Sequence, residues 1–377
     1  MIYIYILYII IYNVRLQEKN KRTSQGTHTP TFVSILISTH TYNNNNNNNN
    51  KMYFNASRRT LTRALATATS STRSMSSKVG FIGLGNMGGH MAHNLLKAKH
   101  EVVVFDVAQS AVDKAVAQGA SSAATPRELA AEGCDTIVTM LPSNPHVVSV
   151  YTDPETGILA SVKKGALLID SSTIDPNVSR QVAAEAEKAG ATMVDAPVSG
   201  GVGGAEAGTL TFMVGGTDDA FQRAETVLKV MGGNIVHCGD VGTGEVAKLC
   251  NNLVLGISMA GVCEAMNLGI QLGIDRKKLA DIMNTSTARC WSSDTYNPCP
   301  GVMEGVPASR GYEGGFGSAL MQKDLGLVMD AGKTMGAPLP MGGAAHQMYS
   351  LMSAHGAGHK DFGALFEFLT GDHMEKK

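Results

Sequence analysis

The sequence has no surplus of positive charge, because 31 Lys and Arg stand against 32 Asp and Glu, for a formal net charge of −1. Proteins that bind nucleic acid usually carry a basic patch, so we expect no nucleic-acid partner. The chain has six cysteines, and no two of them have the spacing of a zinc site or a redox motif. The sequence therefore predicts no metal site, and its cysteines are those of a protein in a reducing compartment.

The first 77 residues lack the composition of a folded domain. Met1–Tyr12 is apolar but too short to span a bilayer, and residues 43–50 are eight consecutive asparagines. From Met52, a candidate translation start, to Lys78 the segment has four arginines, many Ser and Thr, and no acidic residue. That composition is typical of a mitochondrial transit peptide. We expect a disordered leader and transit peptide over residues 1–77, a location in the mitochondrial matrix and no membrane partner. A disordered tail without a targeting role is the alternative.

A glycine-rich turn follows the first predicted strand, Lys78–Gly83, and leads into a predicted helix, Met87–Ala98. The turn reads Gly83-Leu84-Gly85-Asn86-Met87-Gly88, which is the G-x-G-x-x-G motif in its required strand–turn–helix setting. In this motif the first glycine makes the tight turn, the second admits a pyrophosphate and the third lets helix and strand pack closely. The turn therefore predicts a dinucleotide site.

The second predicted strand, Glu101–Phe105, ends in an acidic residue, Asp106. A carboxylate at this place binds the hydroxyl groups of an adenosine ribose and repels a 2′-phosphate. No arginine follows it directly to receive such a phosphate. The sequence therefore favours NAD over NADP.

Strands and helices then alternate up to residue 241, which predicts a Rossmann-type, doubly wound parallel sheet over residues 78–241. The next buried strands are Asp135–Leu141 and Gly165–Ile169. Ligands of such sheets lie beyond the carboxyl ends of the strands. Leu141, Pro142 and Thr173 are therefore expected to line the nicotinamide half of the cofactor, although Thr173 also suits simple capping of the helix that follows.

A glycine-rich loop, Ser199-Gly200-Gly201, follows the predicted strand Thr192–Val194. Its hydroxyl group and unhindered backbone N–H groups could bind a small anion such as a carboxylate. The alternative is a flexible turn between two strands.

A long helix is predicted over Gly242–Gly273, and it begins an all-helical C-terminal domain, residues 242–377. Lys248 and Asn252 are four residues apart and therefore share one face of this helix. On most helices such a pair is solvated, but here the helix is long enough to join the two domains.

Four ordered blocks together resemble the β-hydroxyacid dehydrogenase family, over about residues 78–370. They are the Gly83–Gly88 turn, Asp195-x-Pro197-Val198-Ser199-Gly200-Gly201, Gly242-x-Gly244-x-x-x-Lys248-x-x-x-Asn252, and Lys323-Asp324-Leu325-Gly326-Leu327. The nearest resemblance is to members that oxidise 3-hydroxyisobutyrate with NAD in valine catabolism. One departure is the loop after Pro142, Ser143-Asn144-Pro145-His146, in which an Asn is expected near His146.

The resemblance implies a role for each block. The first block would bind NAD, and Ser199, Gly200 and Gly201 would hold the carboxylate of the substrate. Lys248 would be the catalytic lysine, and Asn252 would hold substrate beside it. Lys323 would lie close to nicotinamide, with Asp324 supporting it. The family also implies a homodimer or homotetramer.

The expected reaction is hydride transfer from a primary alcohol to NAD, with Lys248 as general base, or as general acid in reverse. Partial burial and a second cation at Lys323 would lower the pKa of Lys248 toward neutrality. The alternatives are sister enzymes that act on tartronate semialdehyde, glyoxylate or succinic semialdehyde, or a non-catalytic NAD sensor.

Overall fold

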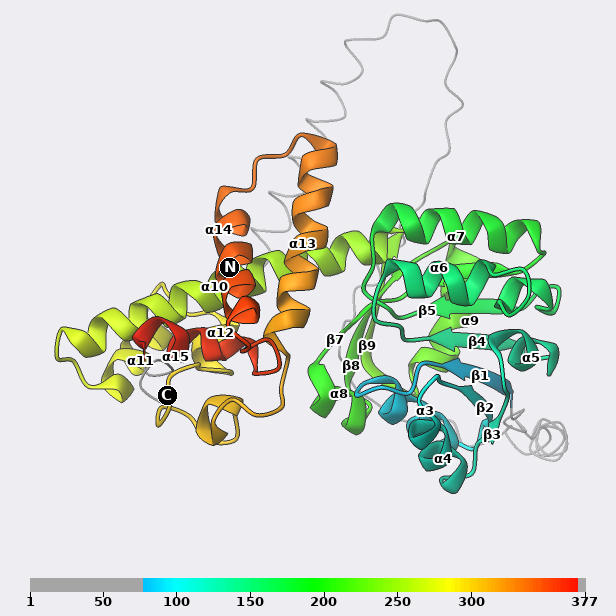
Figure 1. Ribbon diagram of the computed structural model, residues 1–377, viewed down its shortest axis with the longest axis horizontal. Helices are drawn as coiled ribbons and strands as arrows, with labels where there is room; N and C mark the ends of the chain where they lie inside the picture. The colour runs from blue at the N-terminus through cyan, green and yellow to red at the C-terminus, as the bar shows by residue number, and fades with distance from the viewer. Residues whose placement is uncertain (1–76, 372–377) are drawn as a thin grey trace, which may run out of the picture. The chain divides into compact units, whose positions relative to one another are not determined.

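The computed structural model describes residues 77–371, so the predicted leader and transit peptide lie outside the described residues. The described chain begins with a nine-stranded sheet and continues into a group of helices, and helix α10 (Thr243–Gln271) runs from one to the other (Figure 1). This order of a Rossmann-type sheet, a long connecting helix and a helical part confirms the predicted fold class. The exact boundary between residues 241 and 242 stays a prediction.

Six strands of the sheet are parallel, and adjacent strands in the sheet are hydrogen-bonded in the order β3 (Ser121–Ser122), β2 (Glu101–Phe105), β1 (Lys78–Ile82), β4 (Thr136–Thr139), β5 (Leu167–Asp170) and β6 (Thr192–Asp195). Every residue of β4 and β5 is buried. Strands covered on both faces read as continuous apolar runs, which is why these segments were recognisable in the sequence.

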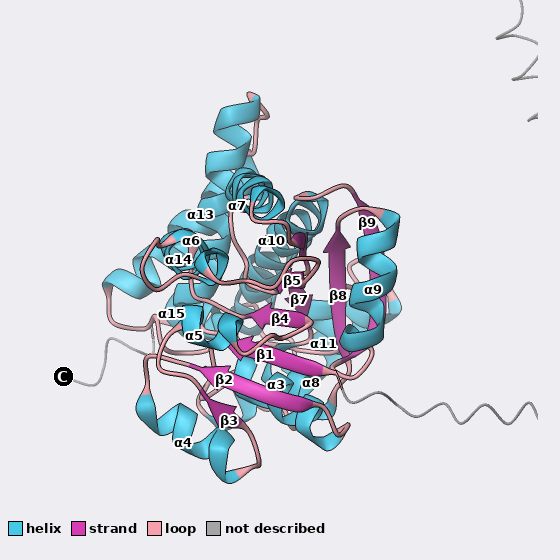
Figure 2. Ribbon diagram, turned by 90° about the vertical axis from the view of Figure 1, so that its right-hand side faces the viewer, coloured by secondary structure: helices cyan, strands magenta, loops and turns pink. Residues whose placement is uncertain are grey.

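The prediction of a wholly parallel sheet is wrong at its other end. Strand β8 (Leu210–Gly215) is antiparallel to both β6 and β7 (Val198–Ser199), and β9 (Gly232–Gly239) is parallel to β8. Between β7 and β8 the chain has only a glycine turn and the short helix α8 (Gly201–Ala207). A parallel crossover needs about a dozen residues or more, so this connection reverses the chain instead. Figure 2 shows β8 and β9 at this end of the sheet.

Helices cover both faces of the sheet. One core cluster contains buried residues of α3 (Gly88–Lys97), α4 (Gln109–Ala117) and α9 (Asp218–Leu228). A second cluster contains those of α5 (Pro126–Ala131), α6 (Asn144–Thr152), the 3₁₀ turn η1 (Ile158–Ala160) and α7 (Pro176–Lys188). The sheet is therefore doubly wound, and its strand ends are left for ligands.

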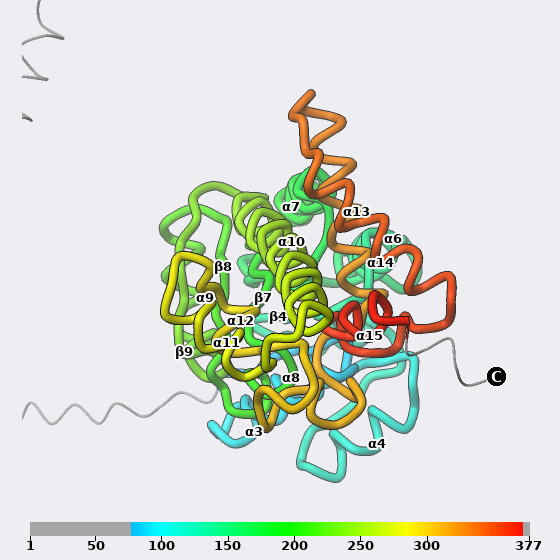
Figure 3. The backbone as a smooth tube through the Cα atoms, turned by 90° about the vertical axis from the view of Figure 1, so that its left-hand side faces the viewer, coloured from blue at the N-terminus to red at the C-terminus, as the bar shows by residue number. Residues whose placement is uncertain are grey.

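The C-terminal elements pack around the second half of α10, and Figure 3 shows α10 and α13 passing one another. They are α11 (Arg276–Thr285), α12 (Trp291–Asp294), η2 (Pro307–Arg310), α13 (Ser318–Met335), α14 (Pro340–Ala354), η3 (Phe362–Ala364) and α15 (Leu365–Thr370). Gly256 of α10 permits the approach of α13, because a Cβ there would lie 3.1 Å from Leu325 and 3.2 Å from the sulfur of Met321.

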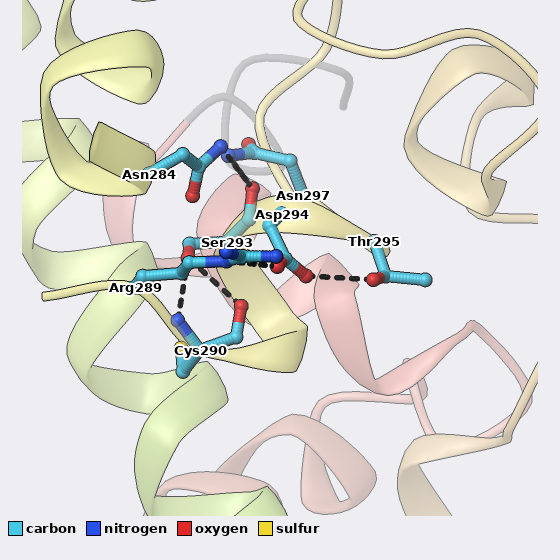
Figure 4. A network of polar contacts seen from close by, with 7 residues as sticks. All are labelled: Asn284, Arg289, Cys290, Ser293, Asp294, Thr295 and Asn297. Atoms are coloured by element: carbon cyan, nitrogen blue, oxygen red, sulfur yellow. Dashed lines mark hydrogen bonds and ion pairs between the residues drawn. The ribbon is translucent and has the colours of Figure 1, made fainter. Parts of the chain in front are cut away.

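A polar network fixes the turn between α11 and α12 (Figure 4). The side-chain amides of Asn284 and Asn297 both donate to the backbone oxygen of Ser293, each over 3.2 Å. Arg289 donates to the carboxylate of Asp294 over 2.7 Å. These contacts hold the four-residue helix α12, which has too few backbone hydrogen bonds to be stable alone.

Helix α10 is, within the described residues, the helix long and apolar enough to cross a membrane. A helix at the core of a folded protein meets the same criterion, and α10 carries buried polar side chains that a lipid environment would disfavour, among them Glu245, Lys248 and Asn252. We therefore interpret α10 as a helix of the protein core rather than as a membrane span.

Candidate active site

The glycine turn leaves open space where a dinucleotide would sit. Gly83 has φ +96°, and a Cβ there would collide with the backbone oxygen of Met140. A Cβ on Gly88 would collide with the backbone oxygen of Gly83, so α3 can approach the turn only with glycine at this position. A Cβ on Gly85 would meet nothing within 4 Å. The turn thus has a bare, accessible backbone at the N-terminus of α3, which suits a pyrophosphate.

Asp106 anchors this turn from the end of β2. One of its carboxylate oxygens accepts the backbone N–H of Leu84 over 2.6 Å, and the other accepts that of Ala108 over 2.7 Å. Gly85 and Asn86 remain exposed, and Met87 occupies the N-cap position of α3 without a side-chain hydrogen bond. Each carboxylate oxygen can accept further hydrogen bonds, so these two contacts leave Asp106 able to accept ribose hydroxyl groups, and its role in ribose binding stays a prediction.

The loops after β4 and β5 are tied together. The backbone N–H of Leu141 donates to the hydroxyl of Ser172 over 2.9 Å. Asn144 belongs to the loop that differs from the family pattern. Its side-chain oxygen accepts the backbone N–H of Asp175 over 3.0 Å, so this residue has a structural contact. Asp175 itself caps α7 through the N–H of Asn177. Helix capping therefore does not occupy Thr173, and the alternative reading of that residue loses its basis.

Lys323 of α13 joins the helical part to the sheet. Its ammonium donates to the backbone oxygen of Thr173 over 2.7 Å and lies 3.0 Å from the carboxylate of Asp324. A cation is thereby held at the carboxyl end of β5, where a ligand of the sheet is expected.

Asp324 links this cation to α10. Its second carboxylate oxygen accepts the side-chain amide of Asn252 over 2.5 Å, and the Oδ1 of Asn252 accepts a hydrogen bond from Asn251 over 3.0 Å. Asn252 is 1% exposed and Asp324 is 3% exposed. The amide of Asn252 is therefore held in one orientation by a buried charged partner.

Lys248 lies one turn before Asn252 and is 8% exposed. Its ammonium has neither a hydrogen bond nor an ion pair within the described residues. Burial lowers the pKa of Lys248, the carboxylates of Asp324 and Glu245 oppose this shift, and the positive charge of Lys323 adds to it. A buried lysine with a lowered pKa and no partner is suited to proton transfer rather than to stabilising the fold.

The Ser199-Gly200-Gly201 loop lies at the end of β7. Gly200 and Gly201 have φ +136° and +64°, and α8 begins at Gly201, so backbone N–H groups are exposed at a helix start. Within the described residues no hydrogen bond links this loop to Lys248. The connection runs through β8, which pairs with β7 and packs against α10. The structure thus brings Thr173, Lys248, Asn252, Lys323 and Asp324 together, and the loop is related to that group only through β8.

Sequence reasoning missed three buried carboxylates beneath this group: Asp170, Asp195 and Glu245. Asp195 accepts the N–H of Gly242 over 2.6 Å and that of Glu245 over 2.9 Å, so it caps α10. Glu245 stands in the first turn of α10, where an acidic side chain is usually solvated, but it is fully buried. The available signal was that β5 and β6, which are adjacent in the sheet, both end in Asp.

Comparisons with known proteins agree with this geometry. Residues 78–239 match the family described as the NAD binding domain of 6-phosphogluconate dehydrogenase, and residues 242–369 match the family described as NAD-binding of NADP-dependent 3-hydroxyisobutyrate dehydrogenase. The chain is 60% identical over 297 residues to the probable mitochondrial 3-hydroxyisobutyrate dehydrogenase of Dictyostelium discoideum. The aligned residues are 79% of this chain and 92% of that protein. The chain belongs to the 3-hydroxyisobutyrate dehydrogenase family.

Other members of the 3-hydroxyisobutyrate dehydrogenase family extend the likeness. The human mitochondrial 3-hydroxyisobutyrate dehydrogenase is 53% identical over 315 residues, which are 83% of this chain and 93% of that protein. A solved structure of the Mycobacterium tuberculosis enzyme with L-serine superposes with a TM-score of 0.74 at 42% identity, covering 78% of this chain and 99% of that one.

Membership of this family makes the chain an NAD-dependent dehydrogenase with a small-molecule hydroxy acid as its substrate. The open backbone at Gly85 and the carboxylate of Asp106 fit NAD. When bound, NAD supplies the hydride acceptor of the reaction, and the chain supplies orientation and proton transfer.

Proposed function

We propose that the protein oxidises 3-hydroxyisobutyrate to methylmalonate semialdehyde with NAD, a step in the breakdown of valine. The proposal is supported by the names of the most similar relatives. The observation that carries it within this chain is the buried, unpaired amine of Lys248 beside the Asn252–Asp324–Lys323 chain of contacts.

Each residue has one task in this proposal. Lys248 in its neutral form accepts the proton of the substrate hydroxyl group, and as an ammonium it returns that proton in the reverse reaction. Asn252, held by Asp324, orients the same hydroxyl group. The backbone N–H groups and the hydroxyl of Ser199–Gly201 hold the carboxylate of the substrate. Two-point holding of a small substrate fixes the position of its reacting carbon and supplies orientation.

The cofactor contacts are assigned in the same way. The exposed backbone of Gly83–Gly88 binds the pyrophosphate, and Asp106 binds the ribose. Leu141, Pro142 and Thr173 line the nicotinamide side, and Lys323 lies between that side and the substrate. All four of these residues lie at the carboxyl ends of β4 and β5 or bond to residues there.

L-Serine is a second candidate substrate, because a related structure contains it. It shares with 3-hydroxyisobutyrate a primary hydroxyl group on the carbon β to a carboxylate. Tartronate semialdehyde, glyoxylate and succinic semialdehyde are the substrates of sister enzymes and are weaker candidates. A non-catalytic NAD sensor would have no use for a buried, unpaired lysine next to the cofactor, and Lys248 argues against it.

The test is initial-rate formation of NADH by the purified protein with a panel of hydroxy acids. The panel is 3-hydroxyisobutyrate, L-serine, 3-hydroxypropionate, glycerate and 4-hydroxybutyrate, each with NAD and with NADP. We expect the highest kcat/KM for 3-hydroxyisobutyrate with NAD. A higher value for another acid would replace the substrate, and NAD binding without turnover of any acid would support the sensor.

We further propose that the protein is a homodimer or homotetramer. Several large apolar side chains of α10 and its C-cap residue are exposed in the single chain, with exposures of 66% for Val254, 59% for Leu268 and 78% for the C-cap Leu272. Apolar side chains gathered on one long helix favour burial against a second copy. Analytical ultracentrifugation at micromolar concentration tests this, and a monomer at all concentrations would contradict it.

The similar relatives are named mitochondrial, which supports a mitochondrial location for this chain. We propose that it resides in the matrix and that the segment from Met52 to residue 77 is the transit peptide. A fusion of this segment to a fluorescent protein should enter mitochondria, and replacement of its arginines by glutamine should leave the fusion outside.

A further inference from the structure

Three carboxylates are buried together where α10 begins. Asp170 and Asp195 end adjacent strands and are direct partners in the register of β5 and β6. Glu245, in the first turn of α10, donates its backbone N–H to Asp195. All three residues are 0% exposed. Three negative charges buried near one another would repel strongly, so their protonation has to be accounted for.

Asp170 and Asp195 are held as carboxylates by their donors. One oxygen of Asp170, Oδ1, accepts the hydroxyl of Thr139 over 2.8 Å, the hydroxyl of Ser172 over 2.6 Å and the backbone N–H of Ser172 over 3.2 Å. Asp195 accepts two backbone N–H groups at the start of α10, where the helix dipole also favours a negative charge. Donors of this kind stabilise the ionised form of a carboxyl group.

Glu245 has fewer hydrogen-bond donors than the two aspartates. Its Oε2 accepts one backbone N–H, that of Ile174, over 3.2 Å. Its Oε1 has no partner, and neither has Oδ2 of Asp170. These are the two buried carboxylate oxygens without a hydrogen bond among the described residues. The hydroxyl groups of Ser171 and Ser179 are also without partners, so neither of them donates to these oxygens.

A proton on Glu245 would remove one of the three negative charges. Two ionised carboxylates are acceptors only, whereas a protonated one is a donor at its hydroxyl. We propose that Glu245 is a neutral carboxylic acid at physiological pH, and that Glu245 thereby keeps a negative charge away from Lys248. Glu245 is thus a positioning residue, acting through its protonation state on the lysine three residues further along the same face of α10.

The charges that face Glu245 come from three sides and agree with this assignment. Burial raises the pKa of Glu245 well above its ordinary value, and Asp170 of β5 and Asp195 of β6 raise it further. The N–H of Ile174 and the ammonium of Lys323 on α13 oppose this shift. Burial also raises the pKa of Asp170, to about 6, so that Asp170 is mostly ionised at neutral pH.

The consequence for Lys248 depends on the proposed function, because only there does its pKa control the rate. An ionised Glu245 would raise the pKa of Lys248. With Glu245 neutral, Asp324 is the remaining carboxylate that does so, and Lys248 is more easily held as the free amine.

The first test detects the proton itself and needs no activity. The infrared spectrum of the full chain at pH 7.5 should contain the C=O stretching band of a buried carboxylic acid. This band should be lost in Glu245→Gln and kept in the control Glu264→Gln, an exposed position on the same helix. Absence of the band from the unmodified protein, or its persistence in Glu245→Gln, would overturn the proposal.

The second test separates a neutral from an ionised Glu245 by its effect on Lys248. The glutamine amide is uncharged, as the neutral acid is, so the pH at which kcat/KM rises should move by less than about 0.3 unit in Glu245→Gln. Loss of an ionised neighbour would instead move it to lower pH by about one unit or more. Glu245→Ala, which leaves the backbone N–H of Ile174 without its acceptor, should lower the thermal midpoint, and Glu245→Gln should keep it closer to that of the unmodified protein.

If the band is present and assigned to Glu245 but no substrate is turned over, the protonation proposal stands and the proposed function fails. If substrate is turned over but the band is absent, the proposed function stands and the protonation proposal fails.

Discussion

Replacing Lys248 by alanine should separate catalysis from folding. The ammonium of Lys248 has no hydrogen bond or ion pair within the described residues, so its removal strands no partner. The substitution loses the packing of the alkyl chain but also removes a costly buried amine. We expect the free energy of unfolding to change by less than about 2 kcal/mol.

The effect on turnover should be much larger. Positioned general acid–base groups contribute roughly 10²–10⁴ in rate, which corresponds to about 2.7–5.4 kcal/mol of transition-state stabilisation. We therefore expect kcat for Lys248→Ala to fall by at least about a hundredfold, with the affinity for NAD nearly unchanged because no cofactor contact is assigned to this side chain.

The pH profile gives a second measure of the same role. Burial lowers the pKa of Lys248, so the free amine becomes populated, and oxidation faster, as the pH rises through a value below that of an ordinary lysine. This rising limb should disappear in Lys248→Ala.

The assay is steady-state NADH formation from pH 6 to 10, with NAD affinity measured by calorimetry. The matched control is Lys277→Ala, an exposed lysine in the first turn of α11, which should keep both kcat and the pH profile. A kcat for Lys248→Ala within about threefold of the unmodified enzyme, or an unchanged rising limb, would refute the assignment of proton transfer to this residue.

Three further predictions concern the neighbours of Lys248. Asp324→Asn removes the charge that holds both Lys323 and Asn252, and since hydrogen bonds to charged groups contribute about 1.5–3 kcal/mol, kcat/KM should fall by about tenfold or more; a smaller loss would show that other contacts orient Asn252. Asp106→Ser should lower the preference for NAD over NADP by at least about tenfold in kcat/KM, and an unchanged ratio would remove Asp106 from ribose recognition. Glu245 holds its proton more tightly in the folded than in the unfolded chain, so the unmodified protein should lose stability relative to Glu245→Gln as the pH rises above about 4.5, measured by thermal unfolding; parallel curves would contradict the raised pKa of Glu245.

Much of the fold was predictable because its signals are local. The glycine turn at Gly83–Gly88 follows a buried apolar strand directly. Asp106 comes directly after the next apolar strand, so its position at the end of that strand can be read from the order of residues alone. The long helix over residues 243–271 has no proline and a regular apolar spacing, and its observed ends lie within two residues of the predicted ones.

The reversal of the sheet at β8 was not predictable in the same way. Strands β6 and β8 both read as short apolar runs, and neither run states the direction in which it will pair. The direction is decided by the short connection through α8 and by the packing of α10 against β8. The deep burial of Lys248 and Asn252 was underestimated for a related reason, since it depends on α13, seventy and more residues further along the chain.

The sequence by itself determined the residue types and their order: the dinucleotide turn, the acidic residue that follows it, and a lysine and an asparagine one turn apart on a long helix. Only the tertiary structure decided which side chains share a volume. Lys323 reaches the backbone of Thr173, and Asp170, Asp195 and Glu245 share one buried site, because the carboxyl ends of parallel strands and the start of α10 converge there. The physical reason is that protonation and the pKa of a buried group depend on the charges and donors around it in space, and these come from segments that are distant in the sequence.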